Sequence, residues 1–193
     1  MKKKGFFARN YSACWKFFVQ SRWHIVFSLG IFALMFLVGF AFPVFWRGEI
    51  FGFMKEMVAM LEGKSSFEIV IFIFFNNLRA SFFAMILGIG AGIFPLVTGI
   101  INGYLLGFVS REVVNEGGML VLWRLAPHGI FELPAILFSI GIGLKIGTGL
   151  FGKDVKKNLR YNFREGLRFF VFVIFPLLLV AGIIEGVLIG LAV

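Results

Sequence analysis

Seven polar or charged residues interrupt the apolar stretches of this 193-residue sequence and are the first candidates for chemistry: Asn76, Asn77, Arg79, Asn102, His128, Glu132 and Glu185. His128 and Glu132 are four residues apart, so on a helix they lie on one face and the imidazole can pair with the carboxylate. Ionisable groups within apolar segments mark ion sites, proton relays or polar helix contacts. These residues therefore predict a buried polar cluster, which is either a functional site or a structural one.

The sequence argues against most enzyme classes. It contains no H-E-x-x-H helix, no G-x-S-x-G element and no phosphate-binding loop. With one Cys and two His it offers little for zinc, so we expect no metal site and no cofactor. An intramembrane enzyme with Glu132 and His128 as acid and base ranks last among the hypotheses, because no nucleophile completes the site. We expect the protein not to be an enzyme.

The composition indicates that the elements holding these residues are membrane helices. Hydrophobic residues make up 60% of the chain, 28 residues are Phe, and the mean hydropathy is +0.95. A soluble domain of this length could not bury so much apolar surface. The net charge of +9 is concentrated in two blocks beside apolar runs, which indicates membrane topology and not nucleic-acid binding.

We predict an all-α polytopic bundle that forms a single membrane domain over residues 1–193. Each crossing needs about 20 mostly apolar residues. The predicted spans are 24–46, 67–90, 94–110, 128–149 and 169–191, with a tight turn near 90–95 where Gly and Pro gather. A polar loop is expected from Arg111, and Pro127 favours a helix start.

Two further segments are predicted to be amphipathic helices on the membrane surface, at residues 1–23 and 47–68. In the second, Ile50, Met54, Met57, Val58 and Leu61 share one face, and the stretch from Ser65 to Glu68 has the spacing of a capping box.

The basic residues set the expected orientation in the cell membrane. Residues 1–23 and 153–168 carry most of the Lys and Arg, which places the N-terminus and the 153–168 loop in the cytoplasm, beside anionic headgroups. Five crossings then place the C-terminus outside. On this topology most of the polar cluster lies about 6 to 15 Å below the outer surface. Arg79 is expected either to extend toward the membrane surface or to pair with Glu132.

Small residues recur every four positions in two predicted spans. Gly99, Gly103 and Gly107 form one stripe, and Gly182 and Gly186 begin another. Such stripes let helix backbones approach closely where lipid offers no hydrophobic drive. We expect tight packing within one chain or in a homo-oligomer, in preference to a pore lining.

The segment Pro127-His128-Gly129-Ile130-Phe131-Glu132-Leu133-Pro134-Ala135, with Asn76-Asn77 and Asn102-Gly103 upstream, resembles the stage II sporulation protein M family. The similarity covers most of the chain in length and in the order of spans. In spore-forming bacteria the family member is a multi-span protein that anchors two peptidoglycan-remodelling partners during engulfment. The resemblance implies a scaffold that binds membrane proteins.

Our leading hypothesis is therefore a membrane scaffold that binds partner proteins through its small-residue faces and its outer amphipathic segment. The alternative is a small transporter or channel with its polar site around His128 and Glu132.

Overall fold

The computed structural model describes the backbone of residues 5–120, 122 and 126–192, and the side chains of these residues apart from 126–128 and 189–192. All regular elements within these ranges are helices, which confirms the all-α prediction. Their bounds are α1 Phe6–Ala41, α2 Arg47–Leu61, α3 Ser66–Ile86, η1 Leu87–Ile89, α4 Ile93–Gly117, α5 Ala126–Thr148, η3 Gly149–Phe151, α6 Val155–Phe169, the π-helical turn η4 Phe170–Ile174, and α7 Phe175–Ala192.

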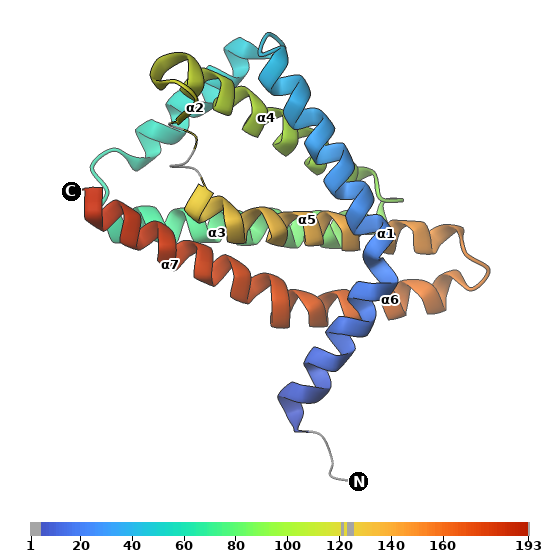
Figure 1. The fold of residues 1–193 in the computed structure, drawn as a ribbon. Helices are drawn as coiled ribbons and strands as arrows, with labels where there is room; N and C mark the ends of the chain where they lie inside the picture. Colours follow the sequence, from blue (N-terminus) through green and yellow to red (C-terminus); the bar gives the residue numbers. More distant parts are fainter. Residues whose placement is uncertain (1–4, 121, 123–125, 193) are drawn as a thin grey trace.

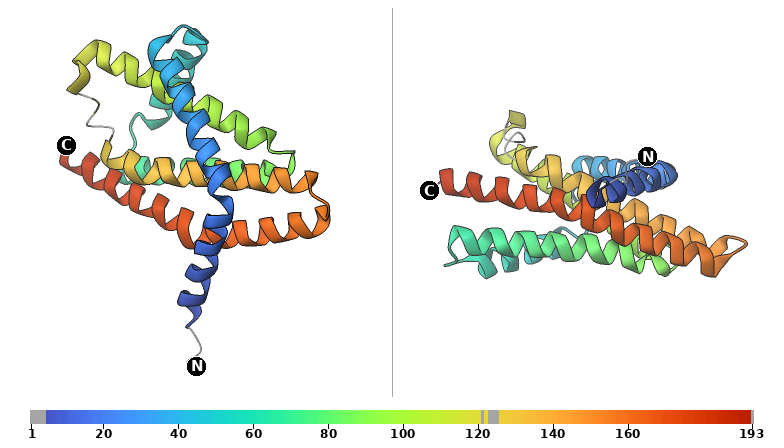
Figure 2. Two further views of the ribbon diagram at one scale, coloured as in Figure 1. Left: turned by 45° about the vertical axis from the view of Figure 1, so that its right-hand side comes forward. Right: turned by 90° about the horizontal axis from the view of Figure 1, so that it is seen from below.

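Five helical stretches are long and apolar enough to cross a membrane: Phe6–Ala41, Ser66–Ile89, Ile93–Gly117, Gly129–Phe151 and Val155–Leu188. In Figure 1, α3, α5 and α7 run alongside one another and α6 continues α7, while α1 crosses this group obliquely. A second view shows the same crossing, and α4 packs along the second half of α1 (Figure 2). The protein is therefore a multi-span helical membrane protein.

The α1 and α4 helices run parallel and in close contact. The glycine at 103 faces Phe32 and the glycine at 107 faces Phe36, so both helices advance in the same direction. At the end of this pair the Tyr104 hydroxyl accepts a hydrogen bond from the Phe45 amide, and its proton faces the carbonyl oxygens of Phe42 and Phe45 at 3.1 and 3.0 Å. These bonds fix the turn that leads from α1 into α2.

The main core lies where α1, α3, α5 and the α6–α7 helix meet. Its fully buried side chains include Phe17, Met85, Ile142, Ile146 and Ile174. A Cβ added at Gly88 would overlap the backbone of Gly143, which shows how closely α3 and α5 approach at their ends. Small residues are thus used here for packing between helices of one chain.

Two local predictions are confirmed. Ser65 and Glu68 form the capping box at the start of α3, with the Glu68 Oε2 2.9 Å from the Ser65 amide. The turn between α3 and α4 occupies Gly90–Gly92, where Ala91 and Gly92 have φ of 56° and 77°. Glycine tolerates this left-handed conformation without steric cost.

The predicted break between a surface helix at 1–23 and a first span at 24–46 is wrong, because α1 is continuous from Phe6 to Ala41. No Gly or Pro interrupts the chain near residue 23, and buried Phe17 and Ser21 carry the packed face across that point. The helix ends before residue 46, since Pro43 disfavours helical geometry in the residue before it.

Two predicted loops are also helical. The polar stretch from Arg111 belongs to α4, which continues to Gly117, and Gly118 has a φ of 78° that suits a helix end. The basic stretch 153–168 is largely α6 and not a loop. Its apolar residues recur at helical spacing and pack on the core, so charge density alone is a poor guide to loop structure here.

Candidate functional site

The structure brings two of the predicted cluster residues together. Asn102 of α4 and Glu132 of α5 both line a recess of about 240 Å³, whose other walls are apolar side chains of α1, α4 and α5. Asn102 is half-buried and donates its side-chain amide to the carbonyl oxygen of Thr98 at 2.8 Å. Glu132 is half-buried and is engaged in an interaction within the chain. This recess holds a carboxylate beside an amide in apolar surroundings, which suits a cation or a proton.

The predicted pair of His128 and Glu132 lies partly outside the described residues. The backbone places both positions on α5, one turn apart, but the His128 side chain is not among those described. The pair therefore stays a prediction.

Asn76 and Arg79 lie elsewhere, on an exposed face of α3. They line a groove of about 390 Å³ together with Lys64, Glu68, Ile71 and nearby Phe residues. Arg79 and Glu132 line different recesses, so of the two expectations for Arg79 the described residues do not show the pairing with Glu132, and extension toward the membrane surface stays a prediction. An arginine near the middle of a span costs about 3 kcal/mol on insertion scales.

Asn77 is half-buried on α3, and Glu185 is half-buried on α7 and engaged within the chain. Neither lines the recess that holds Asn102 and Glu132. A depth worked out from residue spacing gives the level of a side chain but not the direction in which it points around its helix. That is why residues predicted at one level separate onto different faces.

Sequence reasoning missed a charged cluster on α6. Glu165 is only 5% exposed and accepts from Arg164 at 2.9 Å and from Arg168. Arg168 follows Glu165 by three residues on the same helix, a spacing that could have identified the pair. The carboxylate lies within electrostatic reach of Cys14 of α1, in the region where α1 and α6 are in contact.

A second group of polar contacts joins α1 to α5 and α6. The His24 Nε2 lies 2.9 Å from the Thr148 hydroxyl, and Tyr161 donates to the Gln20 side chain at 2.9 Å. The Lys145 ammonium lies 4.7 Å from the centre of the Phe17 ring. These contacts hold the first half of α1 against α5 and α6, and no sequence motif pointed to them.

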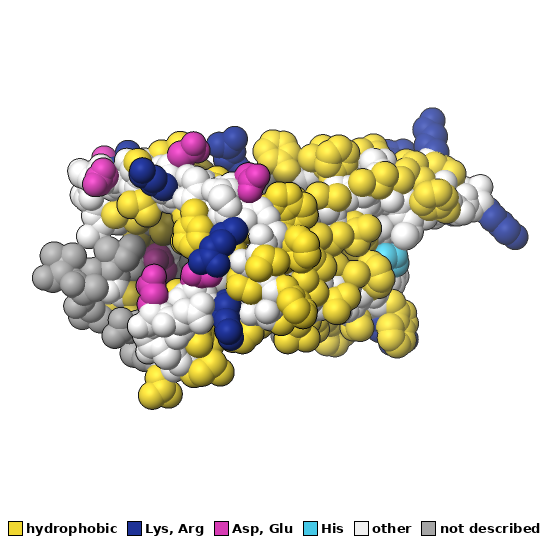
Figure 3. Space-filling view, turned by 90° about the horizontal axis from the view of Figure 1, so that it is seen from above, with side chains coloured by type: hydrophobic (Ala, Val, Ile, Leu, Met, Phe, Trp, Pro, Cys, Tyr) yellow, Lys and Arg dark blue, Asp and Glu magenta, His cyan; other side chains and the backbone are white. Residues whose placement is uncertain are grey.

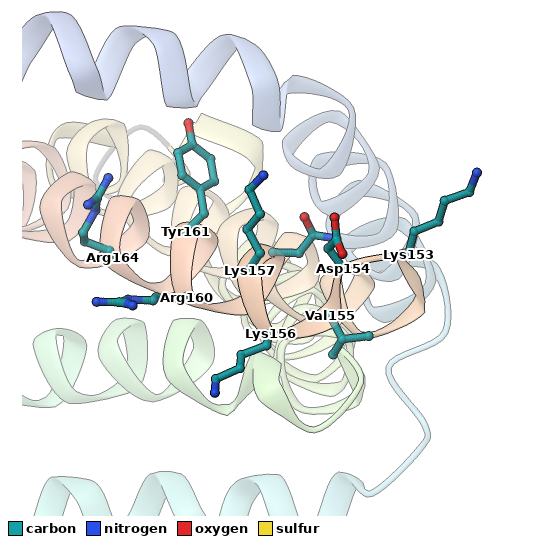
Figure 4. Close-up of a pocket in the computed structure, with 9 residues that line it drawn as sticks. Lys153, Asp154, Val155, Lys156, Lys157, Arg160, Tyr161 and Arg164 are labelled. Atoms are coloured by element: carbon teal, nitrogen blue, oxygen red, sulfur yellow. The ribbon is translucent and has the colours of Figure 1, made fainter.

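A broad hollow lies against a strongly basic face of α6. It measures about 960 Å³, and its charged lining is mostly cationic: Lys153, Asp154, Lys156, Lys157, Arg160 and Arg164. Figure 4 shows these side chains extending from α6 and from the turn before it, with the Tyr161 ring among them. The opposite side of α6 carries Leu159 and Phe163, which pack on the core. The helix is therefore amphipathic, with a cationic outer face suited to phosphate groups.

Acidic side chains gather at the other end of the molecule. In Figure 3 they lie mainly at the left end of the view, mixed with Lys and Arg, whereas the charged side chains at the right end are Lys and Arg and hydrophobic side chains cover much of the middle. The residues near the α2 end include Glu49, Glu112 and Glu116. The two ends of the bundle thus differ in charge, with an apolar band between them.

The sequence matches the stage II sporulation protein M family over residues 25–188, which is most of the chain. The chain belongs to this family. In this stage II sporulation protein M family member, the matched region includes all of α2 to α6 and most of α7, and the Pro127–Ala135 segment that carried the resemblance forms the beginning of α5.

Two relatives of this family member are uncharacterized proteins of Methanocaldococcus jannaschii. One is 30% identical over 139 residues, which cover 68% of this chain and 60% of the relative. The other is 36% identical over 73 residues, which cover 37% of this chain and 41% of the relative. The alignments thus span less than two thirds of either relative. No solved structure matches the chain.

Proposed function

We propose that this protein is a membrane scaffold that binds and localises partner membrane proteins, and that α2 is its main partner-binding element. One observation carries the proposal: no residue of α2 is buried, although α2 is a regular helix of 15 residues. Its Phe53, Val58 and Met60 are all more than half exposed. A helix this apolar is stabilised by covering its surface with another protein or with lipid.

The start of α2 is attached to the bundle, which would present the rest of the helix in a fixed direction. Arg47 pairs with Glu112 of α4 at 3.3 Å, and the rings of Phe51 and Phe108 lie 5.6 Å apart. Beyond this point α2 contacts the other helices little. An attached but uncovered helix supports a docking role.

We expect the small-residue stripes to contribute less to partner binding than α2 does. Gly103 and Gly107 face α1, and Gly182 and Gly186 face Phe74 and Val70 of α3. The Gly103 and Gly107 surface is thus covered by α1, while Gly182 and Gly186 also line an open groove of about 420 Å³ between α3 and α7. The proposal therefore gives the main binding role to α2, which has no buried residue.

The test is quantitative copurification from native membranes in mild detergent. We expect the triple variant Phe53→Ser, Val58→Asn, Met60→Gln to recover partner proteins at least about fivefold less well, because an exposed apolar anchor contributes about 1 kcal/mol or more to binding. The matched control is Phe151→Ser, since Phe151 is 78% exposed in the turn between α5 and α6. A wild-type chain that recruits no partner and is fully monomeric would remove the basis for a scaffold.

The proposed orientation places the N-terminus and α6 in the cytoplasm, where the basic face of α6 contacts anionic headgroups, and the C-terminus outside. The charge difference between the two ends supports it. In intact cells a membrane-impermeant maleimide should label Lys64→Cys but label Lys157→Cys only after permeabilisation. The native Cys14 is buried, so labelling of the wild-type protein gives the background rate of maleimide reaction. The reverse labelling pattern would invert the topology.

A second candidate function, a small transporter or channel, is favoured by the recess that holds Asn102 and Glu132. If the recess carries a cation, Glu132→Gln should abolish cation-dependent uptake into vesicles containing the purified protein, while leaving the protein folded. The control is Asn77→Asp, which adds a carboxylate on α3 away from the recess. Uptake equal to that of empty vesicles in the wild type would exclude the transport function for that cation.

A further inference from the structure

Arg79 occupies an unusual position for a cation in a membrane protein. It lies thirteen residues after the start of the Ser66–Ile89 span and ten before its end, so it is about 15 Å from the nearer end. It is exposed on α3 and not directed into the bundle. Ionisable side chains in spans usually face the bundle interior or pair with another group. The exposed face of α3 therefore has an uncompensated charge at mid-span.

The acidic groups nearest in sequence do not neutralise Arg79 within the described chain. Glu68 is eleven residues earlier, about 16 Å along the helix, and its Oε2 accepts from the Ser65 amide and hydroxyl. Glu132 lines a different recess. A counter-charge for Arg79 must come from outside the described residues.

The surroundings of Arg79 indicate what kind of group would supply that charge. The groove has apolar walls from Ile71, Phe72 and Phe75, and Asn76 lies on the same face one turn before Arg79. Apolar walls suit an apolar helix, and a guanidinium beside an amide suits a carboxylate. Lipid phosphates lie at the ends of the span, far from its middle.

A second copy of this chain fits the groove less well than another protein does. Glu132 and Glu185 are half-buried, engaged within the chain and only three residues from the ends of the spans Gly129–Phe151 and Val155–Leu188. Glu165 lies deeper, ten residues into its span, but it is buried and already paired with Arg164 and Arg168. They are therefore poorly placed to reach a groove on a neighbouring molecule.

We propose that the α3 groove around Arg79 and Asn76 binds a transmembrane helix of a partner protein that carries an Asp or Glu at mid-membrane depth. The proposal rests on the scaffold function and names the chemistry of one partner. The partner helix lies along Phe72 and Phe75, and its carboxylate accepts hydrogen bonds from the Arg79 guanidinium. Pairing removes the charge from lipid for both proteins.

The test uses the full chain in phosphatidylcholine vesicles and a synthetic oligo-leucine transmembrane peptide with one central Asp and a dansyl acceptor. Energy transfer from the native Trp residues reports association. We expect the Asp peptide to associate roughly tenfold more strongly than a peptide with Leu at the centre. Arg79→Gln should remove this preference, Arg79→Lys should keep part of it, and the α3 control Phe83→Leu should leave it unchanged.

Equal association of the Asp and Leu peptides with the wild type would overturn the proposal, as would a preference that survives Arg79→Gln. An effect of Arg79→Gln on self-association alone would assign the groove to a second copy and overturn it too. The scaffold function is separable, because it is tested by copurification through α2. If the protein recruits no native partner but still prefers the Asp peptide, the scaffold function is overturned and the binding of an acidic helix in the groove is supported.

Discussion

Gly107→Ala is expected to lower the thermal unfolding midpoint of the detergent-solubilised protein by roughly 6 to 12 °C. At this position a Cβ would overlap the carbonyl oxygen of Phe36 and lie 2.9 Å from the amide nitrogen of Phe40. Both obstacles are backbone atoms, so α1 and α4 must move apart along their length. Overpacking of this kind costs about 3 kcal/mol, and each kcal/mol shifts the midpoint by about 2 to 4 °C in a chain of this size.

The matched control is Gly30→Ala, a second helical glycine with the opposite expected sign. Gly30 is exposed on α1, and a Cβ there meets no atom within 4 Å. Alanine restricts the unfolded chain and favours helix, so we expect the midpoint to stay or to rise by about 2 to 4 °C. If Gly107→Ala and Gly30→Ala behave alike, the close approach of α1 and α4 is not present in the protein in solution.

Arg168→Met is expected to lower the midpoint by roughly 4 to 8 °C, because it leaves the buried Glu165 with a single cation. Breaking a buried ion pair costs about 3 to 5 kcal/mol, and the remaining bond from Arg164 reduces this to about 2 kcal/mol. The side chain of Glu165 is 6% exposed and that of Arg168 is 31% exposed. The variant therefore leaves the charge of the carboxylate buried and only partly compensated.

The double variant Glu165→Met, Arg168→Met distinguishes two causes of the lower midpoint: an uncompensated buried charge, and the loss of the contacts made by Arg168. With both charges replaced by apolar groups, most of the lost stability should return. The control is Arg164→Met, whose side chain is 69% exposed and whose loss should cost less than about 1 kcal/mol. If the double variant is less stable than Arg168→Met alone, burial of an uncompensated charge is not the cause of the destabilisation.

The sequence predicted the helical class and the local signals well, because these depend on short-range chemistry. The Ser65–Glu68 cap and the Gly90–Gly92 turn follow directly from side-chain hydrogen bonding and glycine conformation. The ends of the helices were harder to predict from the sequence. The helix α6 was predicted as a loop because its charge was weighed above its apolar periodicity.

The candidate site was predicted only in part. Asn102 and Glu132 share a recess as their positions suggested, whereas Arg79 lies on another face of the bundle. Which way a side chain points depends on how α3 rotates to place Ser81, Ala84 and Met85 in the core. That rotation is a property of the packed helices, so no single span encodes it.

The π-helical turn at Phe170–Ile174 keeps two helices in phase. One row of buried residues continues from α6 into α7 at intervals of four, at positions Asn162, Gly166, Phe170, Ile174, Leu178 and Gly182, with Glu165, Phe169 and Ala181 buried beside it. In a regular α-helix each interval of four rotates the side chain by about 40°, so such a row would spiral away from the core. The wider turn slows this rotation midway. One continuous helical stretch of 34 residues can therefore keep one buried face toward α3 and α5 along its length, with its cationic face turned away at one end.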